Sequence, residues 1–254
     1  KPARKQIEQL VLDRMAKDEI VRQLSEARGV SVTQDALDSA MRDVIDQTGS
    51  ESDVKARIKE LYGWDVATFA ERVVRPFLYR QRLQEKIAFD DTINKPQLQQ
   101  MDALLARVKA GKDDFGVIAD EVNEDATKGM KGDYGIFGKG ERDQAIESAA
   151  YALAPGETSG IVRTVQGFHI LKLISKIPAD AKTGDGEKVQ VSHIFLAAKQ
   201  LDVWLSEQVA SQKVRILLSG YHWDSKIAMV VGPDSTAPAN TNQPKASTNN
   251  NANQ

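Results

Sequence analysis

Apolar side chains recur at steps of three and four along the first 88 residues, a spacing that places them on one face of a helix. Gly29 is suited to end the first of these helices, and Asp65 is suited to cap the start of the last. Pro76 lies inside the last helix, where it removes a backbone donor, and we expect a kink there. The pattern predicts an all-helical part, with helices over residues 2–28, 33–49, 51–62 and 65–88.

After residue 90, glycines and alternating apolar positions predict strands between shorter helices. In the last predicted strand the odd-numbered residues from Val189 to Phe195, His193 among them, share one face, and Ile194 and Leu196 lie on the other. We expect helices over 98–108, 115–122, 144–153 and 199–211, and strands over 133–137, 159–165, 168–177 and 189–196. This order of elements predicts an α+β protein with an all-helical N-terminal lobe and a small antiparallel sheet flanked by helices.

Composition narrows the possible functions. With 34 Lys and Arg against 36 Asp and Glu, a net charge of -2 and a pI near 6.0, the chain has no basic field for nucleic acid. The absence of cysteine excludes disulfides, thiol catalysis and thiolate zinc sites. No apolar run approaches about 18 residues, so no membrane span is predicted, although a removed signal or anchor before Lys1 is compatible with this start. The polar composition of residues 233–254 predicts a disordered tail.

The common catalytic motifs are missing. The glycines between Gly129 and Gly140 lack the Gly-Lys-Ser/Thr ending of a phosphate loop, and no Gly-x-Ser-x-Gly elbow occurs. The three histidines have no ligand spacing, so no metal site is predicted. His169 and His193 both lie in apolar strands, where a histidine is usually a core residue satisfied by one hydrogen bond. If both strands belong to one sheet, the two rings can instead share a polar network.

Four segments, taken in order, form a recognisable pattern. They are Gly-Met-Lys-Gly-Asp-Tyr-Gly-Ile-Phe-Gly-Lys-Gly at 129–140, Ile-Glu-Ser-Ala-Ala-Tyr-Ala-Leu at 146–153, Ala-Pro-Gly-Glu-Thr-Ser-Gly at 154–160 and Gly-Phe-His-Ile-Leu-Lys-Leu at 167–173. Together they resemble the parvulin (PpiC-type) family of peptidyl-prolyl cis-trans isomerases. The helices before them, with Arg-Pro-Phe-Leu at 75–78, resemble the chaperone lobe of extracytoplasmic foldases of the SurA and PrsA kind.

One strand comes at a different place in the chain than it does in parvulins. Parvulins normally begin with a strand carrying Ser-His-Ile-Leu, whereas here Ser-His-Ile-Phe at 192–195 follows the last strand. We therefore expect a circularly permuted domain; the alternative is a truncated second copy beginning at residue 189, for which too few residues follow. The predicted domains are a helical lobe (1–92), a parvulin-like domain (93–197, its first strand supplied by 189–197), a segment that returns to the helical lobe (198–232) and the tail (233–254).

The resemblance also implies site residues. As catalytic residues it implies His193, His169, Asp125 and Thr164, and as substrate-binding residues Tyr134, Ile146, Arg142 and Gln166. Arg142 and Ile146 stand where the family usually has Met and Phe, which predicts a weaker proline pocket. Each residue also has an ordinary structural interpretation: Asp125 as a turn residue, Thr164 and Tyr134 as strand-surface residues, and Ile146 as helix core.

The function implied is prolyl isomerisation and chaperoning of unfolded or proline-containing polypeptides, with no cofactor, metal or nucleic acid. The expected location is outside the cytoplasm, in the periplasm or at the cell surface, with a membrane tether through a removed N-terminal anchor as one arrangement. Two alternatives stay open: a holdase whose pocket is weak or inactive because of Arg142, and a domain in which the two histidines affect stability alone.

Overall fold

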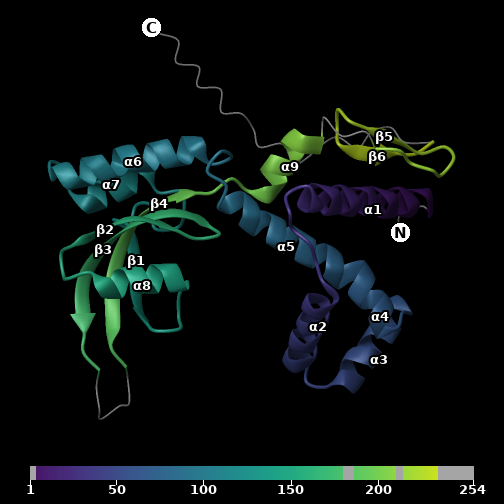
Figure 1. Ribbon diagram of the computed structural model, residues 1–254, viewed down its shortest axis with the longest axis horizontal. Coiled ribbons are helices and arrows are strands. Elements are labelled where there is room, and N and C mark those ends of the chain that lie inside the picture. The colour runs from purple at the N-terminus through teal and green to yellow at the C-terminus, as the bar shows by residue number, and fades with distance from the viewer. Residues whose placement is uncertain (1–3, 180–185, 210–213, 234–254) are drawn as a thin grey trace, which may run out of the picture. The chain divides into compact units, whose positions relative to one another are not determined.

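The computed structural model describes residues 4–179, 186–209 and 214–233, so all but the first residue of the predicted tail lie outside it (Figure 1). The described residues confirm the α+β class. Their contacts form two compact units, one from residues 25–204 and the other from the described parts of 1–24 and 205–254. Each unit is described by itself, and the domain boundaries drawn from the sequence stay predictions.

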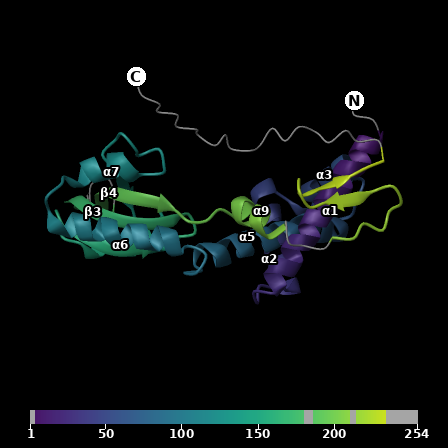
Figure 2. The ribbon, with the colours of Figure 1, turned by 90° about the horizontal axis from the view of Figure 1, so that it is seen from above.

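The smaller unit joins the two ends of the chain. Helix α1 (Arg4–Glu26) lies beside a two-stranded sheet of β5 (His222–Asp224) and β6 (Met229–Val231) (Figure 2). Val230 exchanges two hydrogen bonds with the helix: its N–H donates to Asp13 at 3.0 Å, and its carbonyl accepts from Gln9 at 2.9 Å. These bonds satisfy the outer backbone groups of a short edge strand.

Three helices in the first part of the larger unit begin where a side chain caps them. The helices of this part are α2 (Gln34–Thr48), α3 (Glu51–Tyr62), α4 (Val66–Phe69), the π-helical turn η1 (Ala70–Val74) and α5 (Arg75–Ala88). Thr33, Ser50 and Asp65 each accept a backbone N–H from the first turn of the helix that follows. A π-helical turn, η1, lies just before Pro76, because the N–H of Arg75 bonds to Ala70, five residues back; the kink expected at Pro76 stays a prediction.

A four-stranded antiparallel sheet forms the other part of this unit. Its strands are β1 (Asp133–Gly138), β2 (Thr158–Arg163), β3 (Gly167–Ile177) and β4 (Lys188–Ala197), in the spatial order β1-β4-β3-β2. The strand that comes last of these four along the chain therefore lies second in the sheet, between β1 and β3. The centre of the sheet is incomplete until this fourth strand has joined it.

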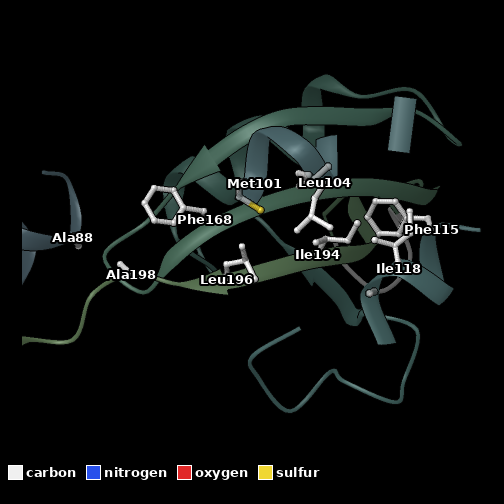
Figure 3. Packing of buried hydrophobic residues seen from close by; sticks show 11 residues of the cluster. Ala88, Met101, Leu104, Phe115, Ile118, Phe168, Ile194, Leu196 and Ala198 are labelled. Carbon is white, nitrogen blue, oxygen red and sulfur yellow. The ribbon is translucent and has the colours of Figure 1, made fainter. Parts of the chain in front are cut away.

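Helices cover both faces of this sheet (Figure 1). On one face, α6 (Lys95–Ala110) and α7 (Phe115–Val122) pack over a core that includes Met101, Ile118, Phe168 and Ile194 (Figure 3). On the other face, α8 (Gln144–Ala152) packs over a core formed by Phe137, Ile146, Ala150, Leu171, Leu173, Val189 and Val191. Helix α9 (Leu201–Val209) begins just after β4, and only its first four residues belong to this unit.

Alternation along β3 and β4 confirms the faces read from the sequence. Ile194 on β4 belongs to the core under α6 and α7, while Val191 belongs to the core under α8. The register pairs His169 with Phe195 and Leu171 with His193. Both histidines therefore lie on the α8 face, on neighbouring strands and two residues out of step, a diagonal within reach of long side chains.

A glycine sets the distance between β4 and the turn before β1. The N–H of His193 donates to the carbonyl of Gly132 at 2.8 Å, and Gly132 has a positive φ of 69°. A Cβ at this position would lie 2.2 Å from the carbonyl oxygen of His193, far inside van der Waals contact. Only glycine provides both this backbone conformation and this close approach.

We predict that Gly132→Ala destabilises the protein by roughly 2 kcal/mol more than Gly129→Ala, because overpacking adds to the cost of a positive φ. Gly129 is the matched control, since its φ is also positive, at 80°, but an added Cβ would meet nothing within 4 Å. Urea unfolding followed by circular dichroism measures both variants. Equal losses of stability would show that the close approach to His193 is unimportant.

Candidate active site

A chain of hydrogen bonds runs across the α8 face of the sheet. Thr164 Oγ1 lies 3.1 Å from His169 Nε2, and His169 Nδ1 lies 3.2 Å from His193 Nδ1. His193 Nε2 in turn lies 3.0 Å from Asp125 Oδ2. The four residues implied as catalytic by the family resemblance are thus linked in one line, from the end of β2 to the loop after α7. Their roles in a reaction stay predictions.

The carboxylate at one end of the line fixes the direction of every bond. An ionised Asp125 can only accept, so His193 carries its proton on Nε2 and presents Nδ1 as an acceptor. His169 must then donate from Nδ1, which leaves its Nε2 to accept from the Thr164 hydroxyl. Both ring tautomers follow from the position of one acid.

Burial keeps both imidazoles neutral. His169 is 1% exposed, and burial, with a smaller contribution from His193, lowers its pKa from 6.5 to about 3. His193 is 0% exposed; burial lowers its pKa as well, although Asp125 works in the opposite direction. Removing an imidazolium from water is unfavourable, and two adjacent positive rings would also repel each other.

Two residues that the sequence analysis missed hold this line in place. Asn123 is buried and bonds to two backbone groups on one edge of the strand bearing His193: its Nδ2 donates to the carbonyl of His193 at 3.0 Å, and its Oδ1 accepts from the N–H of Phe195 at 2.9 Å. Thr127 donates its hydroxyl to Asp125 Oδ1 at 2.5 Å and lies 3.1 Å from His193 Nε2. The signal in the sequence was slight: a threonine two residues after an aspartate, the spacing of an Asx turn.

A cavity of about 490 Å³ opens over the two histidines. Its apolar lining includes Tyr134, whose ring centroid lies 4.4 Å from that of His193, and Phe195, 4.8 Å from His169. Asp125, both histidines, Val165 and Ala197 contribute further wall, as do three glutamines, Gln84, Gln166 and Gln200. The cavity therefore has an aromatic, polar-floored centre and an amide-bearing rim, in the size range of ligand pockets.

The residues implied as substrate-binding are placed differently from one another. Tyr134 and Gln166 line the cavity, whereas Ile146 and Arg142 are not among the residues that line it. Ile146 is 0% exposed and belongs to the core under α8, against which Tyr134 packs. Arg142 holds its guanidinium over the ring of Tyr134, 5.5 Å from the centroid. Direct contact of Ile146 or Arg142 with a client stays a prediction, and both reach the cavity wall through Tyr134.

The site offers polar atoms without a strong nucleophile or a metal cage. Across residues 4–179, 186–209 and 214–233, no group of three His, Asp or Glu side chains is arranged to hold a metal ion. Neutral imidazoles joined to a hydroxyl and a carboxylate can shape and orient a bound amide without forming a bond to it. In the same described residues, no helix has the length and apolar character needed to cross a bilayer.

Comparison with known proteins finds matches to parts of the chain. Residues 84–175 match the Rotamase family, described as the PPIC-type PPIase domain. Foldase protein PrsA of Geobacillus kaustophilus is 30% identical over 190 residues, which cover 64% of this chain and 68% of that protein. The chain belongs to the PrsA family of foldases.

Other members of this foldase group match over shorter or more distant stretches. Chaperone SurA of Yersinia pestis is 30% identical over 121 residues, 46% of this chain and 28% of SurA. A crystal structure of the PrsA peptidylprolyl isomerase from Bacillus cereus is 18% identical, with a TM-score of 0.31 over 68% of this chain and 69% of that one. The PPIC-type match ends at residue 175, before the strand that carries His193.

Because the two histidines are buried, we predict that the protein becomes less stable as the pH falls below 6.5. The pKa of His169 and that of His193 lie below 6.5 in the folded protein. As the pH falls below 6.5, the unfolded chain therefore binds protons that the folded protein does not bind. Each histidine contributes a loss of up to about 1.4 kcal/mol per pH unit, continuing towards about pH 3 for His169. Above pH 6.5 neither contributes a slope.

Urea unfolding at several pH values measures this loss. The double variant His169→Gln, His193→Gln should lack the slope just below pH 6.5, whereas His222→Gln, changed at an exposed residue of β5, should keep it. A double variant with an undiminished slope would mean that the two imidazoles are not held neutral.

Proposed function

We propose that this protein is a peptidyl-prolyl cis-trans isomerase and chaperone that acts on unfolded or extended polypeptides. The observation that carries the proposal is the neutral line of Thr164, His169, His193 and Asp125 on the floor of an aromatic-walled cavity. The PPIC-type match over residues 84–175 and the membership of the PrsA family support it.

Isomerisation of an X-Pro bond is a rotation about an existing bond. The barrier of about 18–20 kcal/mol comes from the partial double bond between carbon and nitrogen, which rotation breaks. An isomerase need not form a covalent bond; it must bind the twisted amide better than the planar one. In the proposed site, Tyr134 and Phe195 contact the proline ring, and the polar line orients the amide before it.

Neutral histidines suit this task better than charged ones. The planar amide carries more charge separation than the twisted amide, because resonance places negative charge on its oxygen. An imidazolium beside that oxygen would stabilise the planar ground state and so raise the barrier. Burial, which lowers the pKa of both histidines, removes this effect over the neutral pH range.

We further propose that the domain is a circular permutation of the usual parvulin order. Two observations support this: β4 lies between β1 and β3, and the family match ends at residue 175 although a strand with Ser-His-Ile-Phe follows at 192–195. Location outside the cytoplasm, with or without a tether to a membrane, is proposed from membership of the PrsA family. Clients would then be secreted chains in an unfolded or extended state.

A specific observation favours a second candidate, a holdase with little isomerase activity. Arg142 lies over Tyr134 at 5.5 Å and over Phe137 at 5.7 Å, so a charged side chain covers part of the apolar wall. A guanidinium beside the cavity resists the desolvation that a proline ring requires. Such a protein would bind extended chains without accelerating isomerisation.

Asp125→Ala tests the proposed isomerase. Without the carboxylate, the ring of His193 loses the acceptor that sets its tautomer, and we expect kcat/KM for an X-Pro peptide to fall about ten- to a hundredfold. A protease-coupled assay measures the rate. Asp102→Ala, changed at an exposed position on α6, is the control and should keep the wild-type rate. An unchanged rate in Asp125→Ala would contradict the proposed role of the line.

Arg142→Met separates the two candidates. With Arg142 replaced by an uncharged side chain, the wall at Tyr134 becomes apolar, and we expect kcat/KM to rise about fivefold, roughly the effect of 1 kcal/mol of added apolar burial. The same assay applies. If both wild type and Arg142→Met leave the spontaneous rate unchanged while still binding an unfolded client, the holdase is the correct function.

A further inference from the structure

Two glutamines line the cavity from segments at or beyond the ends of the family match. Gln84 is the first residue of the matched range 84–175 and lies on α5, the last helix of the helical part. Gln200 lies well after that range, in the short connection between β4 and α9. Both line the same cavity as His169 and His193, and Gln200 does so from outside the matched range.

Gln84 presents a donor. Its side-chain oxygen accepts the N–H of Leu201 at 2.7 Å, which fixes the orientation of the amide. Its nitrogen has only a contact of 3.5 Å with the carbonyl of Lys199, at the outer limit of a hydrogen bond. The N–H groups of this nitrogen are therefore available to a stronger acceptor.

Gln200 presents an acceptor. Its side-chain nitrogen donates to the carbonyl of Ala198 at 3.0 Å, which again fixes the amide. Its side-chain oxygen has no protein partner among the residues that the structure describes, and the residue is exposed. An amide oxygen has two lone pairs and needs no rearrangement to accept an N–H from a ligand.

The backbone between these two glutamines is held in place. Asn94, fully buried, donates from Nδ2 to the carbonyl of Ile87 at 2.7 Å and to that of Asp90 at 2.9 Å. Its Oδ1 accepts the N–H of Lys199 at 2.8 Å, so one side chain joins the end of α5 to the segment that carries Gln200. The donor and the acceptor are therefore preorganised before a client arrives.

We propose that Gln84 and Gln200 are client-binding residues that bind the main chain of the client beside its proline. This inference rests on the proposed function. Gln84 donates to a client carbonyl, and Gln200 accepts a client N–H, the two complementary bonds that an extended chain offers from its backbone. Neutral amides read only the backbone, so the pair tolerates any side chain, as a protein acting on unfolded chains requires.

The proposal is tested with substitutions that separate binding from positioning. Gln84→Glu keeps an oxygen for the N–H of Leu201 but removes the donor; Gln84→Met removes both, and Gln200→Met removes the acceptor. The loss of one neutral hydrogen bond predicts a rise in KM of about three- to tenfold for a peptide with residues on both sides of its proline. We expect kcat to stay within about twofold of wild type, because neither residue touches the line of histidines. Gln99→Glu and Gln99→Met, at an exposed position on α6, are the matched controls.

Ester analogues of the peptide identify the bond partner. Replacing a single client N–H by oxygen, at each position except proline in turn, should raise KM for wild type at one position. In Gln200→Met the same ester should cause no further rise, because the acceptor that reads that N–H is gone. A separate measurement of Kd by fluorescence anisotropy of a labelled peptide should show the same pattern.

Wild-type values of KM and Kd in Gln84→Glu and Gln200→Met would overturn the proposal. A loss of kcat/KM that comes entirely from a lower kcat would overturn it as well. Failure of the proposed function gives a different result. In that case wild type does not accelerate isomerisation, while the anisotropy measurement still shows whether the two variants weaken peptide binding. The two ideas therefore fail separately.

Discussion

The contact between two buried imidazoles is the constraint on which the rest of this site depends. His169 Nδ1 and His193 Nδ1 lie 3.2 Å apart, so one ring must donate and the other accept, and neither can hold a second proton without repelling its neighbour. Everything around the pair serves that requirement. Asp125 fixes the tautomers from one end, the hydroxyl of Thr164 completes the line at the other, and Gly132 lets the backbone of His193 approach closely.

The order of the chain places this contact between strands that are separated by the linker after β3. The strand with His193 is the last of the four, yet it lies in the interior of the sheet, so neither the floor of the cavity nor the α8 core is complete without it. The segment that follows it carries Gln200 and is bonded to Gln84 and Asn94 on the helical side. One stretch of about a dozen residues, 188–201, therefore closes the sheet, supplies a histidine and forms part of the rim.

Local patterns predicted much of this structure, and contacts between distant segments account for what they missed. Steps of three and four gave α3 and α7 with their observed bounds, and alternation gave the two faces of β4 correctly. The full line of four polar residues was implied only by the family resemblance, since no single-strand pattern says which histidines face each other. The π-helical form of the turn before Pro76 and the bonds of Asn123 depend on partners that no local spacing encodes. For the same reason Gln84 looked like one more polar residue on a helix.

Nitrogen-15 NMR of the imidazole rings tests the central claim most directly, because it reports which ring nitrogen bears a proton. At neutral pH the account predicts two neutral rings of opposite tautomer: His169 protonated on Nδ1 and His193 on Nε2. The signal of His169 should remain that of a neutral ring well below pH 6.5, and the lowered pKa of His193 should make its ring take up a second proton at a lower pH than a free imidazole does. Two rings of the same tautomer, or an imidazolium at neutral pH, would contradict the account.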